Sequence, residues 1–350
     1  MFRTQGTGNT DWSGRTLSAL RARRWEERVA PLCEVRNGAL LGLSPQELRS
    51  RIEGGWQAIP RKTARAQQQQ EALRVLLEAL PRQVDCLSIP EHSLLERLLI
   101  QCGCAELEEL EELEAAWALR HRLWVDVGYL QGRVVARLDS RLAQPLREAM
   151  DRPAHNAVRM RLFSVHATLS GLLYIAGALD DGAPQRLFME QVLQADPQDE
   201  EASHLARQYL WAAYDCLDYP QGVLLVHPAL ADPSHFVCGW SLPPEAPILD
   251  AAMLLGGMEG VLPVEKPLDA ALTSLLKNAL RPSEDVALCV QELRLLAKQG
   301  APLEALHHVL APNLCVLETP GIRHAVRALW QGVPRWEACS VPTTVHQAVQ

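Results

Sequence analysis

The chain has 350 residues, of which 34 are basic and 42 acidic, giving a formal net charge of −8 at pH 7. A chain of this length can bury a large core without disulfide staples, as one extended helical array or as two to three packed subdomains. The negative charge argues against a general polyanion-binding role, because neutralising phosphates requires a basic surface. We therefore expect proteins or small molecules as partners, and no nucleic acid.

The cysteines and the apolar runs indicate in which cellular compartment the protein is found. The nine cysteines are an odd number without framework spacing, and Cys216, Cys289 and Cys315 stand in apolar stretches, as buried free thiols usually do. The first residues lack the apolar run of a signal peptide, and no stretch reaches the roughly 20 uninterrupted apolar residues of a spanning helix. We expect a cytoplasmic protein without membrane insertion.

The first hundred residues predict helices separated by clear breaks. Residues 1–14 are polar and without periodicity, which predicts a disordered leader. A helix should follow up to Pro31, and residues 33–43 have room for a minor β-hairpin. Further helices are expected over about 62–80 and from the Ser88-Ile89-Pro90-Glu91 start to Gly103.

The middle of the chain predicts its longest helices. Residues 105–147 show the most regular helical spacing of apolar residues, with bends expected at Gly128 and Gly132. Residues 158–179 are apolar on nearly all faces and predict the central buried helix. The helix after the acidic run 196–201 is expected to reach about Asp218.

Residues 219–247 form the clearest break, because they hold six prolines and an aromatic tip at Phe236 and Trp240. Beyond them the pattern indicates short helices, for which antiparallel pairing is the natural arrangement. We predict an all-α fold, a multi-helix bundle or array of antiparallel helix pairs with at most a minor peripheral β-hairpin. The predicted divisions are a disordered leader 1–14, an N-terminal helical region 15–150, a central helical bundle 151–218, a connecting segment 219–247, a C-terminal helical unit 248–335 and a tail 336–350.

Two Glu-x-x-His pairs are the candidate metal ligands: Glu201 with His204, and Glu304 with His307. Spacing of three residues places each pair on one face of a predicted helix, as a di-metal carboxylate bundle requires. The apolar stripes of the two helices run beside these pairs, which indicates that all four side chains are lateral or solvated. We predict no tightly bound transition metal and no cofactor.

The other candidate sites are less complete. Cys102-Gly-Cys104 resembles half of a zinc knuckle, but no second pair exists, and we expect Gly103 to end a helix with both cysteines packed inward. Among the histidines, His166 has apolar flanks and is the best candidate for a buried titrating group. Nucleotide-binding, hydrolase-elbow and redox signatures are absent.

By exclusion, the sequence favours a non-catalytic intracellular helical adaptor, scaffold or regulatory subunit that acts through protein–protein interaction. Phe236 and Trp240 are the predicted partner-binding residues, with an internal plug between helices as the competing interpretation. One alternative is a helical metal-dependent enzyme that uses the paired Glu-x-x-His motifs. The other is a bacterial secretion-linked effector or regulator.

Overall fold

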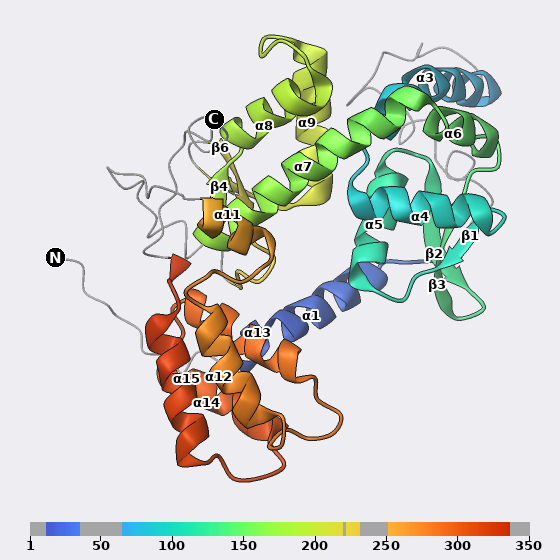
Figure 1. Ribbon diagram of the computed structural model, residues 1–350. Helices are drawn as coiled ribbons and strands as arrows, with labels where there is room; N and C mark the ends of the chain where they lie inside the picture. The colour runs from blue at the N-terminus through green and yellow to red at the C-terminus, as the bar shows by residue number, and fades with distance from the viewer. Residues whose placement is uncertain (1–11, 36–64, 220–221, 232–250, 337–350) are drawn as a thin grey trace. The chain divides into compact units, whose positions relative to one another are not determined.

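The computed structural model describes residues 12–35, 65–219, 222–231 and 251–336 (Figure 1). Of these residues, 63% are helical and 11% lie in strands, which form two small antiparallel sheets. The prediction of an all-α fold is therefore wrong, because the protein is a mixed α/β protein in which helix predominates. The predicted hairpin segment 33–43 and the predicted leader and tail lie largely outside the described residues.

The chain forms two compact units, each assembled from separate stretches. Unit 1 comprises residues 1–22, 166–184 and 214–350, and unit 2 comprises residues 23–165 and 185–213. Helices α1, α7 and α8 each contribute residues to both units. The divisions proposed from the sequence were consecutive segments, and they stay predictions.

Unit 2 combines helices with the first sheet, whose strand order is β1-β3-β2. Its elements are most of α1 (Leu17–Val29), α3 (Arg65–Asp85), α4 (Ile89–Ile100), β1 (Cys104–Glu106), α5 (Leu110–His121), β2 (Val125–Leu130), β3 (Arg133–Leu138), α6 (Ala143–Met150), the first half of α7 (Pro153–Ala176), the end of α8 (Gly182–Phe188), the short π-helical segment η2 (Met189–Leu193) and α9 (Glu200–Ala213).

The sheet of unit 2 corrects the prediction of a long helical stretch over residues 105–147. Strands β2 and β3 pair in register from Val125 opposite Leu138 to Leu130 opposite Arg133. The turn between them has positive φ at both Gln131 (52°) and Gly132 (81°), the conformation of a tight hairpin turn. Gly132 therefore reverses the chain, where a bend in a helix was predicted.

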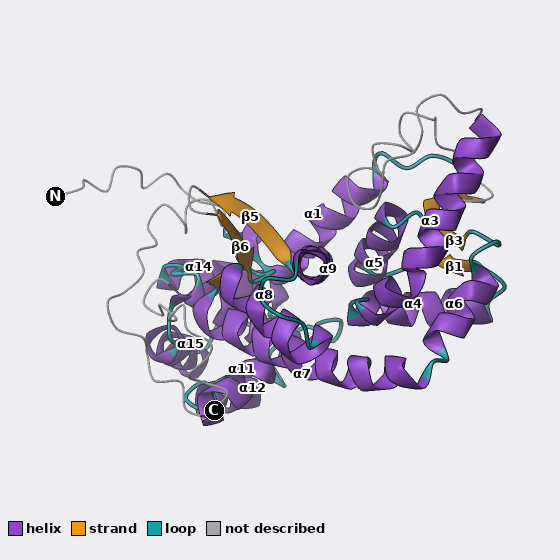
Figure 2. Cartoon of the chain, turned by 90° about the horizontal axis from the view of Figure 1, so that it is seen from above, coloured by secondary structure: helices purple, strands orange, loops and turns teal. Residues whose placement is uncertain are grey.

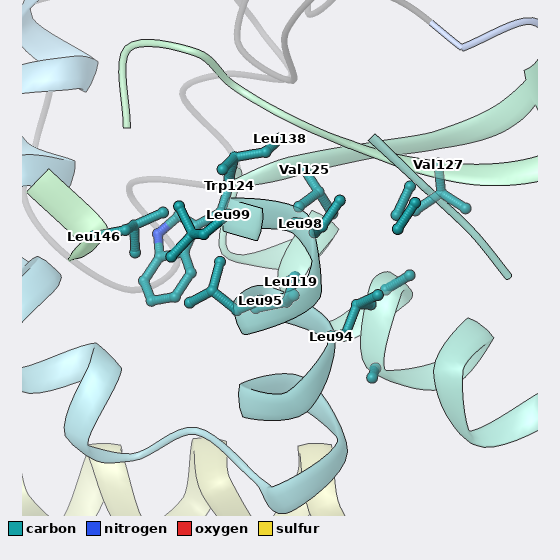
Figure 3. Close-up of a cluster of buried hydrophobic side chains, with 14 of the residues drawn as sticks. Leu94, Leu95, Leu98, Leu99, Leu119, Trp124, Val125, Val127, Leu138 and Leu146 are labelled. Carbon is teal, nitrogen blue, oxygen red and sulfur yellow. The ribbon is translucent and has the colours of Figure 1, made fainter. Parts of the chain in front are cut away.

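The core of unit 2 lies between this sheet and helices α4 and α5 (Figure 3). Leucines of α4 meet the indole of Trp124, which is completely buried where α5 gives way to β2. The predicted helix start at Ser88 is confirmed, because Ser88 and Glu91 form a capping box with bonds of 2.8 and 3.3 Å. Four leucines on one face of this helix are buried: Leu94, Leu95, Leu98 and Leu99.

Unit 1 contains the second sheet, whose strand order is β4-β6-β5; its strands β5 and β6 are labelled in Figure 2. Its elements are the 3-10 turn η1 (Ser13–Arg15), the start of α1, the second half of α7, β4 (Ala178–Asp180), the start of α8, β5 (Asp215–Tyr219), β6 (Gly222–Val226), α11 (Ala251–Met258), α12 (Lys266–Leu276), α13 (Val286–Lys298), α14 (Leu303–Leu310), the 3-10 turn η3 (Ala311–Asn313) and α15 (Pro320–Gly332). The expected helix up to Asp218 is wrong at its end, because α9 stops at Ala213 and β5 follows.

Helices α12 to α15 form a small bundle in unit 1 (Figure 1). Its core is built from aliphatic residues that are fully buried, among them Leu272, Leu293, Leu306 and Leu329. Helix α13 begins at an N-cap in which the Asp285 side chain accepts from two backbone N–H groups. These helices lie where the sequence predicted short helices separated by Pro and Gly.

Candidate functional site

A loop at the edge of the C-terminal bundle presents apolar side chains to solvent. This loop, residues 315–318, follows a short bridge in which Leu280 pairs antiparallel with Leu314. The backbone N–H of Cys315 then donates to the Ala279 carbonyl at 2.9 Å. The incoming end of the loop is therefore fixed by backbone bonds to the residues that follow α12.

The outgoing end of the loop is fixed by side chains. The Glu318 carboxylate pairs with His307 Nδ1 at 2.6 Å, and the Glu318 carbonyl accepts from the Arg323 guanidinium at 3.2 Å. The Thr319 hydroxyl accepts from the backbone N–H of Ile322 at 3.3 Å and caps α15. The loop is thus held at both ends.

Between these anchors, Val316 and Leu317 are 50% and 93% exposed. Leu275 of α12, 41% exposed, lies beside the start of α15, because its Cδ2 atom is 3.8 Å from the position that a Cβ would take on Gly321. We call Leu275, Val316 and Leu317 the Val-Leu surface. Scattered exposed aliphatic residues are normal, but neighbouring ones on a fixed backbone are a typical contact for another protein.

Basic side chains accompany the Val-Leu surface. Lys277 directly follows α12, and the backbone N–H of Arg281 donates to the Asn313 carbonyl just before the loop. Within the described ranges, no carboxylate forms an ion pair with Lys277 or Arg281. The nearest acid of the loop, Glu318, is engaged by His307. The surface therefore combines apolar anchors with uncompensated positive charge.

A chain of polar contacts in unit 2 runs from Asp85 through two histidines to Glu96, and its hydrogen bonds join Asp85, His155 and His92. Asp85 at the end of α3 contacts Nδ1 of His155 at 2.9 Å, and the two Nε2 atoms of His155 and His92 are 3.1 Å apart. The Nδ1 atom of His92 lies 3.6 Å from the Glu96 carboxylate. His155 is buried, His92 is partly buried and Glu96 is 56% exposed, so the chain leads from the interior to the surface.

The two imidazoles meet head-on. Their planes are within 13° of parallel, and their centroids are 5.3 Å apart. The two Nε2 atoms are only 3.1 Å apart, so the two rings lie end to end with their Nε2 atoms between the ring centres. Face-to-face stacking is therefore excluded, and each Nε2 points at the other. Since a carboxylate only accepts, Asp85 assigns a proton to Nδ1 of His155, and one of the two Nε2 atoms supplies the proton between the rings.

This geometry does not fit a metal ion between the rings. Zinc–nitrogen bonds are about 2.0–2.1 Å, so a metal on the line between the two nitrogens would require a separation of about 4 Å. In the described part of the chain, no group of three or more His, Cys, Asp or Glu side chains is arranged to hold a metal ion. The shared proton is therefore the occupant that the geometry supports.

A second buried polar cluster belongs to unit 1. Glu265 is fully buried before α12, and its carboxylate meets Lys298 Nζ at 2.8 Å, the Tyr174 hydroxyl at 2.7 Å and the Leu262 N–H at 2.8 Å. Arg294 pairs with Asp269 at the edge of this cluster. The two cations balance the two carboxylates, which is typical of a buried ionic cluster that fixes neighbouring elements.

The same cluster affects a neighbouring histidine. Burial, with a contribution from the Lys298 charge, lowers the pKa of His227 to about 3. Its Nδ1 accepts from the Ala229 N–H at 3.1 Å, which also requires the neutral ring. Burial and the neighbouring Glu265 raise the pKa of Tyr174, so its hydroxyl remains a donor. These groups are engaged inside the protein.

The structure places the four predicted metal ligands in different surroundings. Glu201 pairs with Arg82, and the ring of His204 is 2.9 Å from the amide nitrogen of Gln208, on the exposed side of α9 in unit 2. Glu304 is exposed on α14 of unit 1, and His307 holds Glu318. Each pair is thus at the surface of its own unit, beside the apolar stripe.

The remaining candidates have mixed outcomes. Gly103 (φ 87°) follows the end of α4 as expected, but the inward packing of the cysteines is wrong for Cys102, which is exposed. Cys289 is buried as predicted, whereas Cys216 and Cys315 are exposed. Phe236 and Trp240 lie outside the described residues.

Sequence reasoning missed both the Val-Leu surface and the histidine chain. It singled out the Cys102-Gly-Cys104 stretch and His166, because it weighed each residue by its neighbours in the sequence. His166 lies in unit 1, 2.8 Å from the Tyr214 hydroxyl. The apolar pair Val316-Leu317 follows Pro312 and does not continue the apolar stripe of a helix. This pattern could have predicted that the pair lies in a loop.

The described helices include none that is long and apolar enough to span a membrane. Comparisons with family models, with curated proteins and with solved structures found no match to this chain.

Proposed function

We propose that this protein is a non-catalytic adaptor or regulatory subunit that binds a protein partner through the Val-Leu surface. The observation that carries the proposal is the almost complete exposure of Leu317 on a loop that is anchored at both ends. Fully burying a leucine side chain contributes about 1.5–3 kcal/mol, and this contribution is unused in the chain alone. A fixed loop also loses little conformational entropy on binding.

The class of partner follows from the charges around the surface. Lys277 and Arg281 favour a partner with acidic groups beside its apolar contact, because complementary charges speed association and exclude wrong partners. The net charge of −8 supports a protein rather than a nucleic acid as that partner. The seven described cysteines are all free, which supports the cytoplasm as the proposed compartment.

The test compares Leu317→Ser with Leu288→Ser in the full-length protein. Leu288 is a matched control, because it is an exposed leucine of the same bundle, on α13. Proteins captured from native lysate by the tagged wild type and by each variant would be quantified by mass spectrometry. We expect Leu317→Ser to weaken capture of a specific partner by about 30-fold, which corresponds to a hot spot of about 2 kcal/mol.

Both leucines are exposed, so the melting temperatures of the two variants should equal that of the wild type. Equal capture by Leu317→Ser, Leu288→Ser and the wild type would contradict the proposal. A partner lost with both variants would show that general surface hydrophobicity, rather than the Val-Leu surface, is responsible.

A further inference from the structure

We infer that the His92–His155 pair is an acid-sensitive latch in unit 2: it joins α3, α4 and α7 while the two rings share one proton between them, and it releases them when both rings become fully protonated. The inference is independent of the proposed partner binding. It rests on the head-on contact of the rings and on the carboxylates at the two ends of this chain of polar contacts, Asp85 and Glu96.

The number of ring protons decides whether the chain is satisfied. With two protons, His155 donates from Nδ1 to Asp85 and His92 donates from Nε2 to His155. With three protons, His155 donates to both neighbours and His92 donates from Nδ1 towards Glu96. With four protons, two N–H groups and two positive charges face each other across 3.1 Å, and the bond between the rings is lost.

The latch connects elements that are also joined by arginines. Arg152 donates to Asp85 at 2.9 Å and to the Pro81 carbonyl at 2.6 Å, which ties the start of α7 to the end of α3. Arg159, one turn after His155, donates to the Leu87 carbonyl at 2.5 Å. The histidine pair adds the bond that brings the first turn of α4 to the first turn of α7.

The surrounding charges do not accommodate a second imidazolium. Asp85 already neutralises Arg152, and buried Glu91 neutralises Arg122 at 3.0 Å. Arg159 faces His92 with a further positive charge, and Tyr209 of α9 lies near that guanidinium. Among the residues that the structure describes, Glu96 is the remaining carboxylate, and its side chain is 56% exposed. The pair can therefore bind a fourth proton only when the contact between His92 and His155 opens.

The direction of the pH effect follows from His92. Burial, with contributions from Arg159 and His155, lowers its pKa to about 4. An unfolded histidine titrates near 6.5, so below that pH the open or unfolded state binds a proton that the closed pair excludes. The closed state is fully favoured above about pH 6.5 and loses its advantage as the pH falls from about 6.5 to about 4.

The test measures hydrogen exchange at the latch itself, because His227 also excludes a proton in unit 1 and affects global stability in acid. Amide protection in α4 and in the first two turns of α7 would be compared at about pH 7 and about pH 5, corrected for intrinsic exchange rates. We expect the protection factors of the full-length wild type to be about tenfold or more lower at pH 5 than at pH 7. One excluded proton changes the opening equilibrium tenfold per pH unit.

His92→Gln is the decisive variant, because its amide can still donate to Nε2 of His155 but does not titrate in this range. We expect it to keep its protection at the lower pH. His204→Gln removes an exposed histidine of the same unit and should behave like the wild type. Equal losses in His92→Gln and the wild type, or equal rescue by His204→Gln, would overturn the latch.

A second measurement covers the case in which His92→Gln does not fold. In nitrogen NMR spectra of the wild type, we expect the His92 ring to stay neutral until the α4 and α7 amides lose protection. A His92 ring that becomes fully protonated near pH 6, with the protection unchanged, would show that the closed pair accepts the fourth proton. That result would end the proposal without any variant.

Discussion

Lys298 and Glu265 bring opposite charges together where neither side chain is exposed. Desolvating such a pair is expensive, and their attraction offsets it only when the other polar atoms of the carboxylate also have partners. Tyr174 and the backbone of Leu262 provide those partners. The pair therefore depends on every member of the cluster, and the loss of one member leaves a buried charge without compensation.

Replacing Lys298 alone by methionine should strongly destabilise unit 1. We expect Lys298→Met to lower the free energy of unfolding by about 3–5 kcal/mol, because buried Glu265 loses its close cation and keeps only the Arg294 Nε atom, 3.8 Å away. Urea unfolding followed by circular dichroism measures this change. The double variant Lys298→Met/Glu265→Gln should lose less than the sum of the single variants, since no unpaired charge is left. A Lys298→Met variant as stable as the wild type would show that the pair is not coupled.

At the scale of elements, the β2–β3 hairpin shows why a regular apolar spacing can mislead. Trp124, Val127, Val134 and Leu138 are separated by three, seven and four residues, which fits one face of a helix. The same stretch is rich in β-branched valine and contains Gln131-Gly132, which takes the two positive φ angles of a tight turn. Turn chemistry and β-propensity decided the structure here.

A close backbone contact gives a test of this hairpin. A Cβ on Gly128 would lie 2.4 Å from the Cys33 carbonyl oxygen, where Tyr129 bonds to residues 33 and 35. We expect Gly128→Ala to lower the melting temperature more than Gly132→Ala, which has open space around its Cβ and suffers only from its positive φ, at about 1 kcal/mol. If Gly128→Ala lowered the melting temperature no more than Gly132→Ala, residues 33–35 would not lie against Gly128 as the structure shows.

Local signals in the sequence predicted several helices but also placed a helix where β2 and β3 lie, and the sites depended on contacts between distant residues. The Ser88 capping box follows from a spacing of three residues and the apolar second half of α7 from its composition, both of which a single element satisfies by itself. His92 and His155 are 63 residues apart, and Leu275 is 40 residues before the start of the loop 315–318. No local pattern brings such residues together, so only the fold revealed these sites.

At the scale of the whole molecule, three helices, α1, α7 and α8, have residues in both units, and the chain also passes from unit 2 to unit 1 between α9 and β5. Helix α7 provides Leu162 and Val165 to unit 2 and Leu169 and Leu172 to unit 1, and all four are buried. The first half of α7 buries one side and exposes Met160 and Phe163, whereas the second half is buried on nearly all sides from Leu169 onward. Each unit therefore depends on the integrity of the same helix.

Leu169→Asp tests this dependence. Leu169 is fully buried, so an aspartate would place a charge without a partner in the core of unit 1, and we expect a loss of more than about 4 kcal/mol or failure to fold. Ser164→Asp is the matched control, because it adds the same charge to an exposed position of α7 and should change stability by less than about 0.5 kcal/mol. Thermal unfolding followed by circular dichroism distinguishes the two. If Leu169→Asp melted like Ser164→Asp, α7 would not be the shared core helix that its burial indicates.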